Sequence, residues 1–275
     1  MLSLAVLVPD TPLLVPGAAG RAHVLDAERT AALVAARAVV RIAPDRVVVV
    51  ASGSLARILD GPVQASLAAA GIADAELGWS GHRVATRAAA IAPTAGPAAS
   101  VALLLLASAG WAGPVTVVEV APPAPAGRIE DLRALGRRLA LGADRVALVV
   151  AGSLSARNGP GAPLAEDDRA GGVDAALLSA LEGVGASSLL ADLAATSTLD
   201  PLATVSGALA AELAVTAWAP LQVLLGAAEQ AHRGAVDVGV RHVARPFGVT
   251  YVVATWHFGI AAPAGAAATS CADAS

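Results

Sequence analysis

The sequence contains no lysine, and only 15% of its 275 residues are charged. Its 18 basic residues are all arginine, and the formal net charge is −4. Domains that bind nucleic acid usually carry a concentrated basic face, and the sequence gives no sign of one. The composition therefore argues against nucleic acid as a partner.

Cysteine is equally scarce, because the single thiol is Cys271 in an alanine-rich segment near the end of the sequence. One cysteine excludes both a disulfide framework and a cysteine-based zinc site within one chain. The absence of disulfides fits a reducing compartment, so we expect a cytoplasmic protein.

Long uninterrupted hydrophobic runs are also lacking, although 56% of the residues are hydrophobic. The longest apolar stretch, residues 98–112, is interrupted by Ser100, Ser108 and Gly110. It is shorter than the roughly 20 residues that span a bilayer, and it predicts a buried helix. Residues 1–9 contain no basic side chain, which predicts a first strand instead of a signal peptide. We expect no membrane association.

The sequence is rich in short aliphatic runs that alternate with alanine-rich helical patterns. Strands are expected at residues 2–8, 46–51, 75–79, 115–120, 145–151, 236–243 and 249–256. Helices are expected at residues 22–42, 98–112, 128–141, 168–182 and 207–230, the last with a break near Pro220.

This alternation indicates an α/β fold with a mostly parallel central sheet and helices on both faces. The last two strands are close enough in sequence to pair antiparallel at one edge of the sheet. Because no linker interrupts the pattern, we expect a single domain over residues 1–257. Residues 258–275 are rich in alanine and glycine and poor in bulky side chains, so we expect a disordered tail.

Two segments about a hundred residues apart are nearly the same. In each, an Asp-Arg pair leads into an aliphatic run and then into a small hydroxyl-rich loop. In open α/β sheets ligands bind outside the carboxyl ends of the strands, so these loops are candidates for function. With the residue that follows the first strand, the candidate ligand-binding set is Asp10, Ser52, Ser54, Ser153, Ser155 and Arg157.

Each of these residues also has a local structural interpretation. Asp10 could bind a cation or accept a ligand proton, or it could cap backbone amides in an Asx-turn. The serine loops could hold an anion with amides and hydroxyls, or their serines could cap helices. Neither loop is a P-loop or a serine-hydrolase elbow. The acidic run of residues 166–168 is typical of a helix N-terminus.

The histidines form no metal-binding motif, because no two have i,i+4 spacing and none stands in a His-x-Glu pattern. They are His23, His82, His232, His242 and His257. Only His82, which follows Trp79-Ser80-Gly81, is expected in a loop that faces a cleft. We therefore expect no metal site from local sequence.

The order of these motifs resembles that of the class III extradiol ring-cleavage dioxygenase B-subunit (LigB-like) superfamily, and more closely an actinobacterial branch of it. The segments that carry the resemblance are residues 9–16, 45–51, 144–157, 218–228 and 246–256. They occur in the expected order and together extend over most of the chain. The resemblance implies a LigB-like α/β architecture.

The dioxygenases of this superfamily hold Fe(II) with two histidines and one carboxylate, and a further histidine acts as acid and base. In this chain the first histidine position corresponds to Asp10 and the second falls within residues 52–54. The acid/base position falls on Ala156, and the carboxylate position falls near Thr216, with Glu212 one turn earlier. Serine and alanine cannot replace imidazole, and a general base is typically worth about 10²–10⁴ in rate. The resemblance implies the fold and argues against the reaction.

Three hypotheses follow, and they leave open whether the protein is an enzyme. In the first, the chain lacks the catalytic Fe(II) triad, needs no cofactor and binds a small anionic or aromatic ligand or a partner protein. In the second, it is an active non-haem Fe(II)-dependent extradiol dioxygenase that acts on a catechol with a rearranged site of Asp10, His82 and Glu212. In the third, it is a structural subunit of a homo-oligomer, because B subunits of the superfamily often dimerise.

Overall fold

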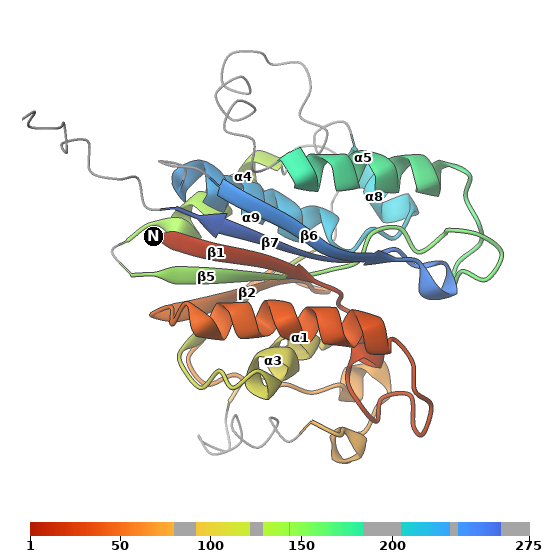
Figure 1. Ribbon diagram of the computed structural model, residues 1–275, viewed down its shortest axis with the longest axis horizontal. Helices are drawn as coiled ribbons and strands as arrows, with labels where there is room; N and C mark the ends of the chain where they lie inside the picture. Colours follow the sequence, from red (N-terminus) through yellow and green to blue (C-terminus); the bar gives the residue numbers. More distant parts are fainter. Residues whose placement is uncertain (80–91, 122–128, 143, 184–204, 232–235, 260–275) are drawn as a thin grey trace, which may run out of the picture.

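The computed structural model describes residues 1–79, 92–121, 129–142, 144–183, 205–231 and 236–259 (Figure 1). Within these residues, one seven-stranded sheet has the order β3-β4-β2-β5-β1-β7-β6. Its strands are β1 (Leu2–Val8), β2 (Arg46–Ser52), β3 (Arg57–Asp60), β4 (Val115–Val120), β5 (Val146–Ala151), β6 (Val236–Ala244) and β7 (Tyr251–Phe258).

The sheet is mixed, so the expectation of a mostly parallel sheet is wrong. Its central strands β4, β2, β5 and β1 run parallel, whereas β3, β7 and β6 are antiparallel to their neighbours. A parallel return needs a long crossover connection. Only residues 53–56 separate β2 from β3, and only residues 245–250 separate β6 from β7, so these outer strands reverse direction. The antiparallel pair expected at the C-terminal edge is confirmed.

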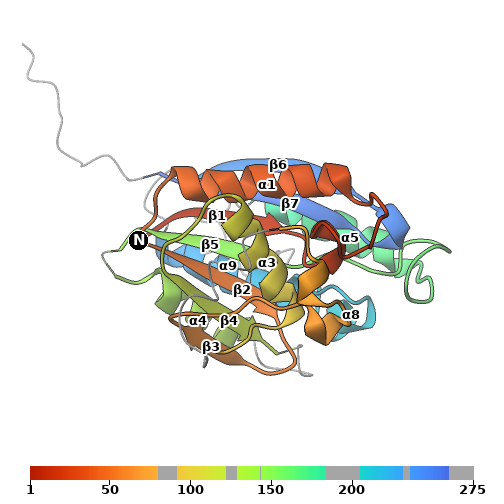
Figure 2. The ribbon, with the colours of Figure 1, turned by 90° about the horizontal axis from the view of Figure 1, so that it is seen from below.

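Helices cover both faces of the sheet, as expected (Figure 1). On one face lie α1 (Asp26–Arg41) and α3 (Pro97–Ser108). On the other face lie α4 (Ile129–Ala140), α5 (Arg169–Gly183), α8 (Gly207–Glu212) and α9 (Trp218–Ala231). The view from below shows α1 and α3 in front of the sheet and the other helices behind it (Figure 2). No helix in the described ranges is both long enough and apolar enough to cross a bilayer.

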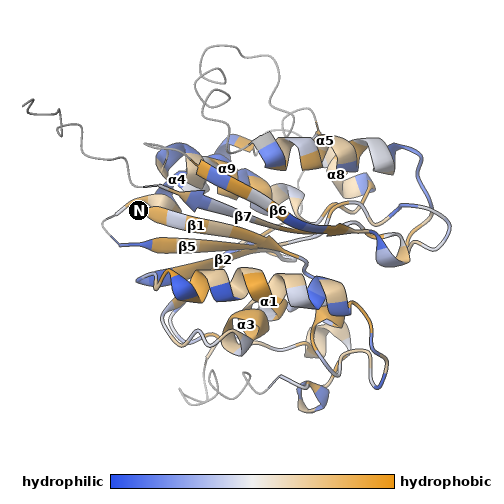
Figure 3. Cartoon of the chain, in the orientation of Figure 1, coloured by the Kyte–Doolittle hydropathy of each residue, from blue (hydrophilic) through white to orange (hydrophobic). Residues whose placement is uncertain are grey.

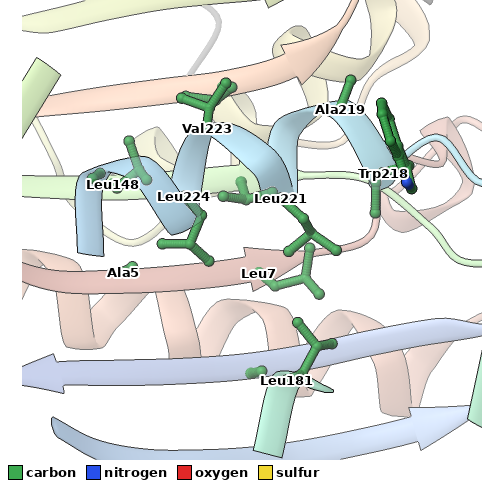
Figure 4. Close-up of a cluster of buried hydrophobic side chains, with 14 of the residues drawn as sticks. Ala5, Leu7, Leu148, Leu181, Trp218, Ala219, Leu221, Val223 and Leu224 are labelled. Atoms are coloured by element: carbon green, nitrogen blue, oxygen red, sulfur yellow. The ribbon is translucent and has the colours of Figure 1, made fainter. Parts of the chain in front are cut away.

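Each central strand serves two cores, because successive side chains point to opposite faces. In β5, Leu148 belongs to the core under α9, whereas Val149 belongs to the core under α1 and α3. The central strands are accordingly apolar along most of their length (Figure 3). In the first core, Leu221 of α9 packs over Leu7 of β1, with Leu181 of α5 beside them (Figure 4).

Four local expectations differ from the structure. The strand expected at residues 75–79 is absent, and Asp74–Glu76 instead forms a short 3-10 turn. β3 was not expected at all. The break in the last helical pattern lies at residues 213–217, while Pro220 occupies the first turn of α9, where its missing N–H costs no helical hydrogen bond. Phe258, expected in the tail, is buried as the last residue of β7. Residues 260–275 lie outside the described part of the chain.

Candidate functional site

Polar residues converge where the carboxyl ends of three neighbouring parallel strands meet the start of α9. Asp10 follows β1, Ser52 ends β2 and Ser153 follows β5. The strands are hydrogen-bonded neighbours, so these residues come from adjacent strand ends. Thr216 joins them from the short segment between α8 and α9. We call Asp10, Ser52, Ser153 and Thr216 the strand-end site.

Hydrogen bonds connect all four residues. The Ser153 hydroxyl donates to Asp10 Oδ1 at 2.6 Å, and the Ser153 amide donates to Thr216 Oγ1 at 2.8 Å. The Ser52 hydroxyl donates to the Thr216 carbonyl at 2.6 Å. Asp10 is half-buried, and its second carboxylate oxygen has no hydrogen-bond partner within the described ranges. The site therefore presents one oriented carboxylate with a free acceptor.

A glycine allows this close approach between β5 and the segment before α9. A Cβ on Gly152 would lie 2.4 Å from Ala217 Cα, so a larger residue would push that segment away. The approach is secured by the Ala217 amide, which donates to the Ser153 carbonyl at 3.0 Å. Gly152 is thus required for Thr216 to reach the strand ends.

The loop after β5 has no free amide for an anion. Every backbone N–H from Gly152 to Asn158 donates to an acceptor within the protein. The acceptors are the carbonyls of Val8, Thr250, Leu213 and Gly248, the Asp174 carboxylate and the hydroxyls of Ser155 and Thr216. The anion hypothesis at this loop rested on backbone amides together with hydroxyls, and the amides are already used within the protein, so they give it no support.

The remaining predicted residues lie outside the strand-end site. Ser155 is fully buried; its amide donates to Asp174 Oδ1 at 2.9 Å and its hydroxyl accepts from the Arg157 amide. The Arg157 guanidinium donates to the carbonyls of Glu212, at 2.6 Å, and Ala165, at 2.8 Å. Ser54 is exposed on the turn after β2. Ser155 and Arg157 therefore hold the loop in place.

Two polar residues beside the site were not predicted from the sequence. Tyr251 begins β7, which runs antiparallel to β1, so the start of β7 lies near Asp10 at the end of β1. Burial raises the pKa of the Tyr251 phenol, the hydrogen bond with Thr11 opposes this rise, and the carboxylates of Asp10 and Glu28 add to it. From the sequence, only the antiparallel direction expected for the last strand could have indicated that Tyr251 lies near Asp10.

Asp174 in α5 was not predicted either, and its buried carboxylate supports the loop after β5. Besides the hydrogen bond from the Ser155 amide, it accepts one from Asn158 Nδ2 at 2.8 Å, and Asn158 also donates to Thr250 Oγ1 at 3.1 Å.

The acidic run before α5 has the role expected of it, because Asp167 accepts from the Arg169 amide at the first residue of the helix. The Arg169 guanidinium lowers the pKa of Asp167 to about 2.

The described residues do not fit an Fe(II) site of the extradiol type. Glu212 is exposed and pairs with Arg169 at 2.9 Å, and none of its contacts involves Asp10. His82, the remaining member of the rearranged triad, falls outside the residues that the structure covers. Within those residues, no three His, Cys, Asp or Glu side chains are grouped to hold a metal ion. The strand-end site offers one carboxylate and hydroxyls in place of the two imidazoles that Fe(II) requires.

The fold and the strand-end site define an α/β protein with a mixed seven-stranded sheet and a polar site at the strand ends. No family model and no curated protein matches the chain. Among solved structures, the chain is similar to uncharacterized protein JW3007 from Escherichia coli K12, with 13% identity and a TM-score of 0.50. The alignment covers 93% of this chain and 99% of that chain. At this identity the likeness concerns the fold alone.

Proposed function

We propose that the chain is a LigB-like protein without the Fe(II)-binding triad, which binds a small molecule at the strand-end site. The observation that carries this proposal is the carboxylate of Asp10, which Ser153 orients through one oxygen while the other accepts no hydrogen bond from the described residues. It stands where α/β sheets usually bind ligands. The convergence of Asp10, Ser52 and Thr216, all reached through the LigB-like motifs, supports the resemblance.

The chemistry of the site favours a ligand that donates hydrogen bonds. An anion would be repelled by the negative charge of Asp10. It would also find no donor among the amides of the loop after β5, because these already donate hydrogen bonds within the protein. A hydroxyl or ammonium group could instead donate to the free oxygen of Asp10. Of the anionic and aromatic ligands expected from the sequence, we therefore favour a hydroxylated aromatic ring such as a catechol, bound without a metal. As part of this proposal the protein is cytoplasmic.

The proposal is tested by calorimetric titration with catechol, with inorganic phosphate as the anionic probe. We expect catechol to bind and phosphate not to bind. Asp10→Asn keeps the shape of the side chain and removes its charge. A hydrogen bond to a charged group contributes about 1.5–3 kcal/mol, so this variant should bind catechol about 10- to 100-fold more weakly.

Ser54→Ala is the matched control, since Ser54 is exposed and lies outside the hydrogen-bonded network. It should bind catechol as the unchanged protein does. Absence of catechol binding, or equal binding by Asp10→Asn, would contradict the proposal. Elemental analysis provides an independent test: stoichiometric iron that is lost in Asp10→Ala would favour the oxygenase hypothesis instead.

A further inference from the structure

β6 forms an open edge of the sheet that is long enough to pair with another strand. It is the last strand in the sheet order, has nine residues and pairs with β7 on one side (Figure 2). No other described strand lies on its outer side. The backbone groups of such an edge form a template for pairing with another chain.

Two exposed residues of opposite charge lie symmetrically about a glycine on this edge. Asp237 and Arg241 flank Gly239, and neither forms an ion pair within the described part of the chain. Arg241 Nε donates to Thr255 Oγ1 at 3.3 Å. Its guanidinium lies 3.7 Å from the position of a Cβ on Gly239, so it extends across the glycine. Asp237 and Gly239 share one face because they are two residues apart.

This pattern is self-complementary in one register. When a strand pairs antiparallel with its own copy about a two-fold axis, opposite residues lie on the same face. An axis at Gly239 sets Asp237 opposite Arg241 of the second copy, and Arg241 opposite Asp237 of that copy. Moving the axis to Val238 or Val240 sets a charged residue opposite glycine and leaves the charges unmatched. Only the register centred on Gly239 forms two cross-strand ion pairs.

From this complementarity we infer that the chain forms a two-fold dimer in which β6 pairs with β6 of a second copy. The register between β6 and β7 shifts between Val240 and His242, so Arg241 is the extra residue of a bulge. Such a residue is not paired regularly with the neighbouring strand, and the bulge bends the outer strand at this point. Charges and bulges also protect the edges of monomers. Protection alone does not require opposite charges at symmetric positions.

Analytical ultracentrifugation of the full chain at low salt, from micromolar to several hundred micromolar protein, tests the inference. We expect a monomer–dimer equilibrium. Asp237→Arg and Arg241→Asp each replace two opposite-charge pairs by two like-charge pairs, so each should weaken the dimer by about 10- to 100-fold. The double variant Asp237→Arg/Arg241→Asp restores both pairs and should dimerise as the unchanged chain does.

Asp60→Arg is the control, because it makes the same charge change on an exposed residue of β3 at the opposite edge. It should leave the equilibrium unchanged, and circular dichroism should show all variants folded. A chain that stays monomeric at every concentration would overturn the inference. So would a folded double variant that fails to dimerise, or an Asp60→Arg variant that dissociates as readily as Asp237→Arg.

Discussion

Replacing Gly136 by alanine should destabilise the protein, although the same change favours a helix. Gly136 lies in α4, and Gly226 lies in the neighbouring α9 (Figure 1). A Cβ on Gly136 would lie 1.9 Å from the Val223 carbonyl oxygen, and a Cβ on Gly226 would lie 1.9 Å from the Arg133 carbonyl oxygen. Each glycine thus faces the backbone of the other helix.

Two opposing terms decide the magnitude. Alanine is better than glycine in a helix interior by about 1 kcal/mol. Against this, the new methyl group must move away from Val223 by more than about 1 Å to reach an ordinary contact, and a helical carbonyl cannot rotate aside. The helices would separate and loosen the packing of Leu132 and Leu135 against the core. Overpacking typically costs about 1–3 kcal/mol, and a contact this short with backbone belongs to the upper part of that range, so we expect a net loss of about 1–2 kcal/mol in the free energy of unfolding.

Urea denaturation at 25 °C measures this change, and the fluorescence of the buried Trp218 and Trp256 reports unfolding. Gly172→Ala in α5 is the matched control, because a Cβ there meets nothing within 4 Å. This variant should be more stable than the unchanged protein by about 0.5–1 kcal/mol. If Gly136→Ala is stabilised by a similar amount, the two helices do not approach as closely as argued and the reasoning is refuted.

Two further predictions concern carboxylates. The buried Glu119 accepts hydrogen bonds from the Gly96 amide and from Arg57 Nε, each at 2.6 Å, so Glu119→Gln should lower the free energy of unfolding by about 1–3 kcal/mol in urea denaturation. An unchanged stability would show that this pair does not hold β3 against β4. Asp167, whose pKa of about 2 is depressed by Arg169, should stabilise the fold above pH 4 and lose this effect as the pH falls toward 2. Carboxyl carbon NMR should show the low pKa, and a titration near pH 4 would contradict it.

Much of the sheet could be predicted because its strands are continuous aliphatic runs with sharp ends. The observed bounds of β1 and β4 agree residue for residue with those expected. β3 has four residues with charged ends, Arg57 and Asp60, and only its pairing with β4 identifies it as a strand. Hydropathy patterns carry no information on strand direction. The mixed character of the sheet follows instead from the short connections between β2 and β3 and between β6 and β7.

The candidate site could be predicted in part, because the carboxyl ends of parallel strands are known to converge. Asp10, Ser52 and Ser153 meet there, and Thr216 was reached through the LigB-like motifs. Ser155 lies outside the strand-end site, and its amide instead donates a hydrogen bond to Asp174, which is nineteen residues away in α5. Local sequence cannot distinguish a serine that faces a crevice from one that supports the loop beneath it.

The hydrogen bonds of the strand-end site explain why histidines alone would not convert it into an iron site. Replacing Asp10 by histidine would remove the acceptor of the Ser153 hydroxyl, and replacing Ser52 would remove the donor to the Thr216 carbonyl. Ser153 also binds Thr216 through its amide, so the carboxylate and the start of α9 are coupled through one residue. The first change would therefore leave the Ser153 hydroxyl without its acceptor, at a cost of about 1–3 kcal/mol. The residues of the strand-end site already form hydrogen bonds with one another. New imidazoles would therefore have to replace these hydrogen bonds as well as supply metal ligands.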